Sequence, residues 1–326
     1  MKTMMKILLA LGIPFWTMAQ VPQVMWDRTF GGSSDDFAYQ IIPSFNGGYM
    51  IGGASLSNIS GDKSQNSKGG TSDYWIIKID SLGKKIWDKT IGGGSADILT
   101  SIIPCEDKGY LIFGFSNSAI SGDKSQNSLG LIDFWIVKID SLGNVQWDKT
   151  IGGSSDDYLN NVIQTPDKGY LLGGYSKSNI SGNKSENCRG QEDYWIVKID
   201  SLGNVQWDKT FGGANNDYCS SIIQTKDKGY LLGGYSNSNF SGDKSQNSKG
   251  SSDYWIIKID SSGNKLWDKT IGGASLDQRA SLIQTTDNQY MLFASSYSNI
   301  SGDKSQNSKG GYDFWIVKID SIGNKI

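Results

Sequence analysis

The sequence contains no histidine among its 326 residues. Without an imidazole, it cannot form a Ser-His-Asp or Cys-His nucleophile, or a metal site with histidine ligands. Cysteine is also scarce, and Cys105, Cys188 and Cys219 lie at unrelated points of the chain. They therefore predict neither a disulfide framework nor a metal cluster. Cys188 and Cys219 could pair, but nothing in their spacing requires it.

Long apolar runs are missing after the N-terminus. Residues 1–19 combine Lys2 and Lys6 with the apolar run Ile7–Trp16 and end at the small residue Ala19, a layout typical of a cleavable signal peptide. No later stretch approaches the roughly 18 apolar residues of a membrane span. The net charge is −2 and the basic residues do not cluster, which disfavours a nucleic-acid partner. We expect a secreted chain located outside the cell, in a periplasm or on the cell surface, and a monomer.

Two tryptophan patterns recur through the chain. Tyr/Phe-Trp-Ile-Val/Ile-Lys-Ile-Asp returns every 60 residues, at Trp75, Trp135, Trp195, Trp255 and Trp315. Trp-Asp-Lys/Arg-Thr also occurs five times, at Trp26, Trp87, Trp147, Trp207 and Trp267. A repeat of this length with several short β-branched and aromatic runs is typical of a propeller blade, not of a helical solenoid. The chain is therefore predicted to be all-β.

Each unit predicts four antiparallel strands. In the third unit these are expected at about 158–165, 169–176, 193–200 and 204–211, where tight turns join the first pair and the last pair. Gly169 is available for a positive φ in the first turn. Both faces of the third strand are apolar, which indicates a sheet packed between two neighbours. Trp195 and its copies are expected to fill the gaps between blades.

The two ends of the repeat array match each other. Val24–Phe30 has the sequence of a fourth strand with no unit before it, and the chain stops at Ile326, where a fourth strand is due. An N-terminal strand that completed the C-terminal blade would close the ring and leave no exposed sheet edge. The sequence therefore predicts a five-bladed β-propeller over residues 20–326, with four antiparallel strands per blade. The alternative is an incomplete piece of a longer array.

The repeats resemble a known family. Gly-Gly-x-x-x-Asp, Asp-Lys-Gly-Tyr, Ser-Gly-Asp-x-Ser-x-Asn and Asp-Tyr-Trp-Ile-Val-Lys-Ile-Asp-x-x-Gly-Asn-x-x-Trp are similar to the repeats of secreted bacterial β-propeller proteins that often carry a type IX secretion sorting domain. The resemblance covers residues 24–326 and implies a secreted propeller, with no activity to carry over. No sorting domain is present in this sequence, which puts that export route in doubt.

One rim of the predicted propeller carries the links between units and the long polar loops. Long polar loops on a rigid sheet are where binding usually resides, so this rim is the expected functional face. An Asp precedes each innermost strand, and the five would ring the mouth of the channel: Asp36, Asp97, Asp157, Asp217 and Asp277. Such a ring could hold Ca²⁺ through oxygen ligands. The favoured alternative is that each Asp caps its own Gly-Gly turn.

The long loops supply a second set of oxygen-bearing side chains. Candidate residues within the loops are Asp62, Asp123, Asn183, Asp243 and Asp303, and those at the loop ends are Asp73, Asp133, Asp193, Asp253 and Asp313. The glycine spacing does not fit an EF-hand, and no closing Glu follows. Asx turns that order a solvated loop are the favoured interpretation, and a cation site is the alternative.

Aromatic side chains suggest a sugar-binding interpretation. Phe115, Tyr175, Tyr235 and Tyr297 are the candidates for stacking on a saccharide, although aromatic residues at strand spacing more often belong to a core. An enzyme such as a glycosidase needs two carboxylates in unequal environments, whereas these units are nearly interchangeable. The sequence therefore favours a non-catalytic, multivalent binding module for a glycan or a cell-surface ligand. A structural or protein-binding propeller comes next, and a glycosidase-type enzyme comes last.

Overall fold

A computed structural model describes residues 24–326, and the predicted signal peptide lies outside them. The described residues form nineteen β-strands in five antiparallel sheets, four of four strands and one of three. None of these residues belongs to a helix, so the described chain has no helix that could cross a membrane. The fold is therefore all-β and built from repeated, propeller-like sheets.

The five sheets follow one another along the chain. The first contains β1 (Asp36–Pro43), β2 (Tyr49–Ser55), β3 (Asp73–Ile79) and β4 (Lys85–Ile91), and the second contains β5 (Asp97–Pro104), β6 (Tyr110–Ser116), β7 (Asp133–Ile139) and β8 (Val145–Ile151). The third contains β9 (Asp157–Gln164), β10 (Tyr170–Ser176), β11 (Asp193–Ile199) and β12 (Val205–Phe211). The fourth contains β13 (Asp217–Gln224), β14 (Tyr230–Ser236), β15 (Asp253–Ile259) and β16 (Lys265–Ile271), and the last contains β17 (Asp277–Gln284), β18 (Tyr290–Ser296) and β19 (Asp313–Ile319).

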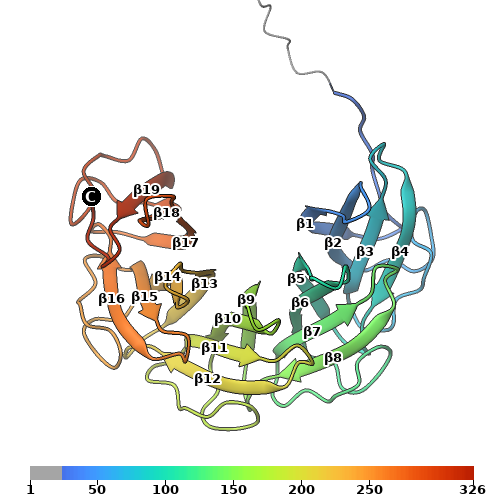
Figure 1. Cartoon of the computed structure of the whole chain (residues 1–326), viewed down its shortest axis with the longest axis horizontal. Helices are drawn as coiled ribbons and strands as arrows, with labels where there is room; N and C mark the ends of the chain where they lie inside the picture. The colour runs from blue at the N-terminus through green and yellow to red at the C-terminus, as the bar shows by residue number, and fades with distance from the viewer. Residues whose placement is uncertain (1–23) are drawn as a thin grey trace, which may run out of the picture.

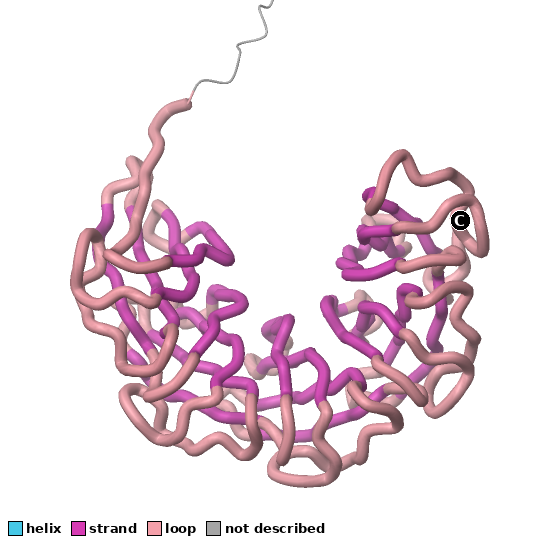
Figure 2. The backbone as a smooth tube through the Cα atoms, turned by 180° about the vertical axis from the view of Figure 1, so that it is seen from behind, coloured by secondary structure: helices cyan, strands magenta, loops and turns pink. Residues whose placement is uncertain are grey.

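The sheets stand side by side in an open arc (Figure 1). The first strand of each sheet lies on the concave side, and the fourth strand of each complete sheet lies on the convex side. Figure 2 shows the same arc from behind, with a wide gap between the first and last sheets. The strands of the third unit begin and end within one residue of the predicted bounds.

The first hairpin of a unit turns differently from the prediction. In the third unit the positive φ belongs to Lys168, at 66°, and not to Gly169. Gly169 is needed for another reason: a Cβ at this position would lie 2.3 Å from the carbonyl oxygen of Ile199. The last hairpin does place its glycine, Gly203, at a positive φ of 81°.

The core lies between the sheets, as the apolar faces predict. Between the second and third sheets, Phe134 and Ile136 from β7 pack against Leu159 and Trp195 of the next unit, and all four side chains are fully buried. The same contact recurs along the arc, and Tyr74 even donates a hydrogen bond of 3.1 Å to the carbonyl oxygen of Trp135. The third-strand tryptophans therefore fill the gaps between sheets, as predicted.

The predicted ring closure is wrong. Val24–Phe30 does not complete the last sheet, which keeps three strands. Trp26 and Phe30 instead pack on Trp75, Ile77 and Ile79 of the first sheet, at the opposite end of the arc (Figure 1). The sequence identified two matching ends, but it could not show whether the curvature of the arc brings them together.

Candidate ligand-binding surface

The five aspartates predicted to ring a channel mouth are instead turned into the protein. Asp97, Asp157, Asp217 and Asp277 have no exposed surface, and Asp36 is partly buried. Each accepts a hydrogen bond from the second glycine of the link before it, for example at 2.6 Å from the Gly153 nitrogen to Asp157 Oδ2. Each also accepts a hydrogen bond from a serine hydroxyl. These contacts are those of the turn-capping interpretation.

The aspartates at the ends of the long loops are capping residues as well. Asp73, Asp133, Asp193 and Asp253 are fully buried, and Asp313 is partly exposed. Oδ2 of each accepts a hydrogen bond from a backbone nitrogen four or five residues earlier in its own loop, for example at 2.7 Å from the Leu129 nitrogen to Asp133. Desolvation raises the pKa of the four buried carboxyls. They order the loops from inside.

The mid-loop residues Asp62, Asp123, Asn183, Asp243 and Asp303 fasten each loop to the link before it. Each side chain accepts a hydrogen bond from the first glycine of that link, at 3.0–3.3 Å. Three of them also form an ion pair with the preceding long loop, in the pairs Lys68–Asp123, Arg189–Asp243 and Lys249–Asp303. At the junction without such a pair, Leu129 lies against Gly182, next to the uncharged Asn183. This junction therefore lacks both the basic and the acidic member of the ion pair.

A buried lysine supports each complete sheet beside these carboxyls. Lys184 donates to the hydroxyl of Thr210 on β12, and its nitrogen lies 5.4 Å from the ring centre of Trp195. Burial lowers the pKa of Lys124 and of Lys244 to about 8. Within residues 24–326, no group of three or more acidic or cysteine side chains is arranged to hold a metal ion, and all three cysteines are unpaired.

The aromatic candidates lead to a different feature of the surface. Phe115, Tyr175 and Tyr235 lie at corresponding places on β6, β10 and β14, and Tyr158 and Tyr218 lie between them. We call these five half-buried side chains the aromatic ladder. Their rings follow one another with centres 5.1, 5.1, 4.8 and 4.8 Å apart. The ladder runs across the second, third and fourth sheets near the rim that carries the long loops.

Tyr297, the fourth predicted stacking residue, is not part of the ladder. The residue of the last unit that corresponds to Tyr235 is Ser295, which lies opposite Phe314 as Tyr235 lies opposite Tyr254. Tyr297 follows β18, is 51% exposed and meets Tyr312 edge to face at 5.3 Å. In the first unit the same position is Ala54. The ladder is therefore confined to the middle of the arc.

A charged cluster that occurs once borders the ladder. Glu192, at the end of the third long loop, accepts a hydrogen bond from the Tyr218 hydroxyl and lies 3.3 Å from Lys177 Nζ. Lys177 also pairs with Asp156, at 3.0 Å. The Asn216 amide donates to the same tyrosine hydroxyl at 2.9 Å. The corresponding residues of the other units are Ser72, Ile132, Ser252 and Tyr312, so the acid breaks the repeat symmetry at one place.

Beside this cluster the ladder borders a concave site of about 380 Å³, within the range of small-molecule pockets. Its lining combines three ladder tyrosines with polar and basic side chains: Asn160, Tyr175, Tyr218, Ser220, Tyr235 and Arg279. Burial raises the pKa of Tyr175, Tyr218 and Tyr235, so all three hydroxyls keep their protons at neutral pH. Tyr218 already donates its proton to Glu192, which leaves Tyr175 and Tyr235 as the donors for a ligand. The site can therefore offer ring faces and hydrogen-bonding groups to one ligand.

No family model matches the chain. A stretch of 163 residues, 47% of the chain, is 23% identical to the regulatory protein FlaEY of Caulobacter vibrioides, and it spans only 17% of that protein. Among solved structures, a protein of unknown function from Dyadobacter fermentans is 12% identical, with a TM-score of 0.45 over 92% of this chain and 79% of that one. A mutant of the Synechocystis apocarotenoid oxygenase is 10% identical, with a TM-score of 0.42 over 84% of this chain and 63% of that one.

Sequence reasoning missed Tyr158, Tyr218, Glu192 and Arg279. It looked for residues that all five units share, whereas these four are departures from the repeat. The position of Tyr158 and Tyr218 is Ile98 in the second unit. This surface could have been found by aligning the five units and looking for polar or aromatic residues that differ from the other units and occur in units next to each other.

Proposed function

We propose that this chain is a secreted, non-catalytic binding module whose concave aromatic ladder and its charged border recognise a glycan. The observation that carries the proposal is the cavity that joins ladder tyrosines to Asn160, Ser220 and Arg279. The carbon-bound hydrogens of a sugar ring pack on an aromatic face, while its hydroxyls need donors and acceptors beside that face. This surface supplies both.

The symmetry of the ladder changes the expected mode of binding. Five equivalent weak sites would rely on avidity, but the ladder is continuous over three sheets and absent from the two outer ones. We therefore propose one extended site for several sugar residues in a row. Asp156 and Glu192 both contact Lys177 in an ion-paired cluster, which supports a binding role for these carboxylates.

A glycan array followed by calorimetry tests the proposal. The purified chain should bind a limited set of oligosaccharides, and Tyr175→Ala or Tyr235→Ala should weaken binding of the best one by about tenfold, the effect of losing one buried aromatic contact. Tyr297→Ala is the matched control, because this exposed tyrosine lies outside the ladder, and it should leave the affinity unchanged.

Two outcomes would contradict the proposal. If the array is silent and a protein partner is recovered instead, the chain is a structural or protein-binding propeller. If a bound glycan is cleaved on incubation, the module is catalytic.

A further inference from the structure

The two end faces of the arc differ from the four junctions inside it. On β19, Phe314 is 80% exposed and Ile316 is 57% exposed, whereas Tyr254 and Ile256 at the same places of β15 are fully buried against the last sheet. Phe293 on β18 adds a side chain that is 46% exposed. The last sheet thus ends in an apolar face of the kind that every other sheet covers with its neighbour.

The fourth strand of a complete sheet bonds to two buried side chains, a tryptophan and a lysine, and to two residues of the long loop. In the fourth sheet, Asp268 of β16 accepts a hydrogen bond of 3.0 Å from the indole of Trp255 and one of 2.9 Å from the Ser245 nitrogen. Thr270 accepts a hydrogen bond from Lys244 Nζ, and its nitrogen donates to Gln246 at 2.8 Å. These contacts fix both the register and the identity of the strand.

In the last sheet the same groups lack these partners among residues 24–326. The Trp315 indole has no hydrogen-bond acceptor, and Lys304 turns to the Ser296 hydroxyl at 2.9 Å. Next to β19, where a fourth strand would pair, lies a groove of about 480 Å³ lined by Lys304, Gln306, Lys309, Phe314, Trp315 and Ile316. Ile326 makes one backbone contact with β19, because its nitrogen donates a hydrogen bond of 3.0 Å to the carbonyl oxygen of Lys318.

The segment Trp26–Phe30 carries the residues that this groove needs. It reads Trp-Asp-Arg-Thr-Phe, where β16 contains Trp-Asp-Lys-Thr-Ile. It already occupies the place of a preceding fourth strand: Trp26 covers Gly83 as Trp267 covers Gly323, and the Gly31 nitrogen donates to Asp62 at 3.2 Å. Asp27 and Thr29 remain exposed, whereas Asp268 and Thr270 are buried.

We propose that two copies of this chain join head to tail, and that Trp26–Phe30 of one copy forms the fourth strand of the last sheet of the other. Asp27 would then accept the hydrogen bond from Trp315, and Thr29 would meet both Lys304 and Gln306. The contact continues the interface already present four times within the arc. Since the donor segment and the acceptor groove lie at opposite ends of one molecule, each copy can bind one neighbour at each end (Figure 1).

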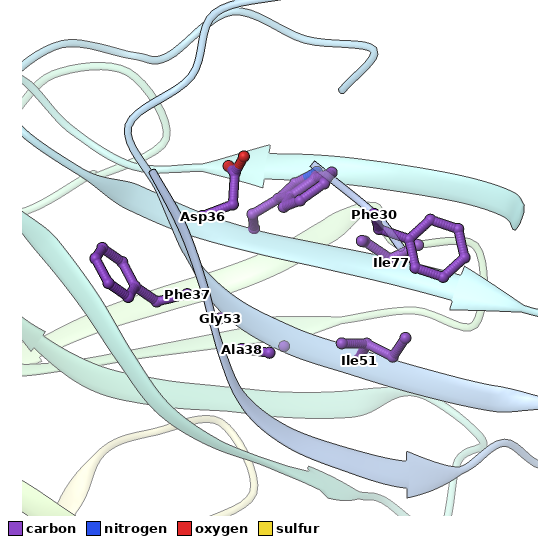
Figure 3. A pocket seen from close by; sticks show the side chains of 9 residues that line it. Phe30, Asp36, Phe37, Ala38, Ile51, Gly53 and Ile77 are labelled. Carbon is purple, nitrogen blue, oxygen red and sulfur yellow. The ribbon is translucent and has the colours of Figure 1, made fainter. Parts of the chain in front are cut away.

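The apolar end faces fit the same arrangement. On the first sheet, Phe30, Ile51, Trp75 and Ile77 line a cavity of about 80 Å³ beside Ala38 (Figure 3). Ile41, at the edge of this face, is 57% exposed, whereas Ile102 at the same place on β5 is buried. Phe314 and Ile316 of the preceding copy would cover this face, as Tyr254 and Ile256 cover the last sheet inside the arc.

Charge complementarity points to the same partner. Among residues 24–326, Asp62 and Lys309 are the two charged members of the loop-to-loop series without an ion pair. Lys309 corresponds to Lys249, whose partner is Asp303 of the next long loop. Across the proposed interface, Lys309 of one copy would face Asp62 of the other.

Sedimentation velocity over a concentration series tests the proposal. The purified chain should form dimers and longer assemblies as the concentration rises. Phe314→Lys with Ile316→Lys blocks the groove at exposed positions, and Asp27→Lys with Thr29→Pro blocks the donor segment while Trp26 and Phe30 stay in place. Each double variant should be monomeric alone, and a mixture of the two should form a one-to-one dimer and nothing longer, because one intact donor and one intact groove remain.

A charge reversal supplies the control for a specific interface. Lys309→Glu alone should weaken assembly several-fold, and Asp62→Lys in the same chain should restore it. A wild-type chain that stays monomeric at several hundred micromolar overturns the proposal, as does a mixture of blocked variants that forms no dimer. Assemblies that persist in both blocked variants would place the interface elsewhere and overturn it equally.

Discussion

At the scale of single residues, the most unusual groups are the buried carboxyls behind the Gly-Gly links. Asp157 and Asp217 each use one oxygen for hydrogen bonds to a glycine nitrogen and a serine hydroxyl, and their Oδ1 atoms have no partner. Desolvation raises the pKa of each carboxyl to about 6. A proton on the unpartnered oxygen would remove the buried charge and leave the accepting oxygen in place.

Replacing Asp157 by Asn should therefore change the pH dependence of stability. Because the folded pKa of about 6 lies above the ordinary value of 3.8, the folded state holds this proton more tightly than the unfolded chain. The resulting stability is present below pH 3.8 and lost as the pH rises through about 6. The free energy of unfolding of the wild type, minus that of Asp157→Asn, should fall by up to about 3 kcal/mol between pH 4 and pH 7.

Urea unfolding at a series of pH values measures this difference. Asp140→Asn is a suitable control, because Asp140 lies in an exposed turn, where hydrogen bonds from Asn144 and Leu142 offset desolvation and lower its pKa. Its difference from the wild type should change in the opposite direction, since a lowered pKa contributes stability that is lost as the pH falls. A difference for Asp157→Asn that is constant with pH would show that folding does not shift the pKa of this carboxyl.

The sequence predicts single residues well where chemistry is local and poorly where it depends on neighbouring units. A short acid after a Gly-Gly pair predicts a capped turn, and Asp36, Asp97 and their copies do cap it. The ladder depends on Tyr175 meeting Tyr218 across a junction between sheets, at a ring distance of 4.8 Å. No spacing within a single unit encodes that contact.

At the scale of elements, the glycines of the links are fixed by what lies behind them. A Cβ on Gly152 would lie 1.7 Å from Oδ1 of the buried Asp133, and one on Gly153 would lie 2.4 Å from the Cβ of Ser178. The next link position differs, because it is Gly94 in one unit and Ala214 or Ala274 in others. The first two glycines are thus required for packing, whereas the third position is variable.

Gly152→Ala should destabilise the protein by about 1–3 kcal/mol, the usual cost of an overpacked core. Gly94→Ala is the matched control, since its Cβ would meet only the Ser121 side chain, with the hydroxyl oxygen at 3.2 Å and the Cβ at 3.6 Å, and the change should stay within about 0.5 kcal/mol. Thermal and urea unfolding of both variants measure the effects. Equal stability of the two variants would mean that the chain relaxes around Asp133 without cost.

The strands themselves were predictable because each unit repeats the same local signals. Turn residues such as Asp80 and Asp200, whose side chains accept hydrogen bonds from their own turns, mark the strand ends closely. The positive φ of Lys168 was not predictable, because glycine beside it is the residue that usually adopts that conformation. Here the glycine is reserved for the close approach to Ile199.

At the scale of the whole molecule, the open arc follows from the angle between neighbouring sheets. The sequence of a single unit does not determine this angle. The matching ends of the sequence, Val24–Phe30 and the residues before Ile326, are equally compatible with a closed ring and with an arc whose ends remain apart. The structure places Trp26 on Gly83 and leaves β19 with a free edge. Only the accumulated rotation over five sheets distinguishes the two arrangements.

Hydrogen exchange should reveal this free edge directly. In dilute solution, the amides of β19 should exchange faster than those of β15. β15 is fully buried and pairs with a strand on each side, whereas β19 pairs with β18 on one side and has a free edge on the other. Mass spectrometry of peptides covering residues 253–259 and 313–319 gives the comparison. Equal protection of the two strands in dilute solution would indicate a covered edge and contradict the open arc.

Because one type of junction between sheets is repeated, such chains can gain or lose whole units during evolution. A closed ring accepts only the number of sheets that completes a full turn, so the gain or loss of one unit strains every junction. In an open arc the junction between β7 and β9 makes the same contacts as that between β11 and β13, and an additional unit would need no new interface. Unequal recombination between near-identical repeats could therefore lengthen or shorten this array without a folding penalty.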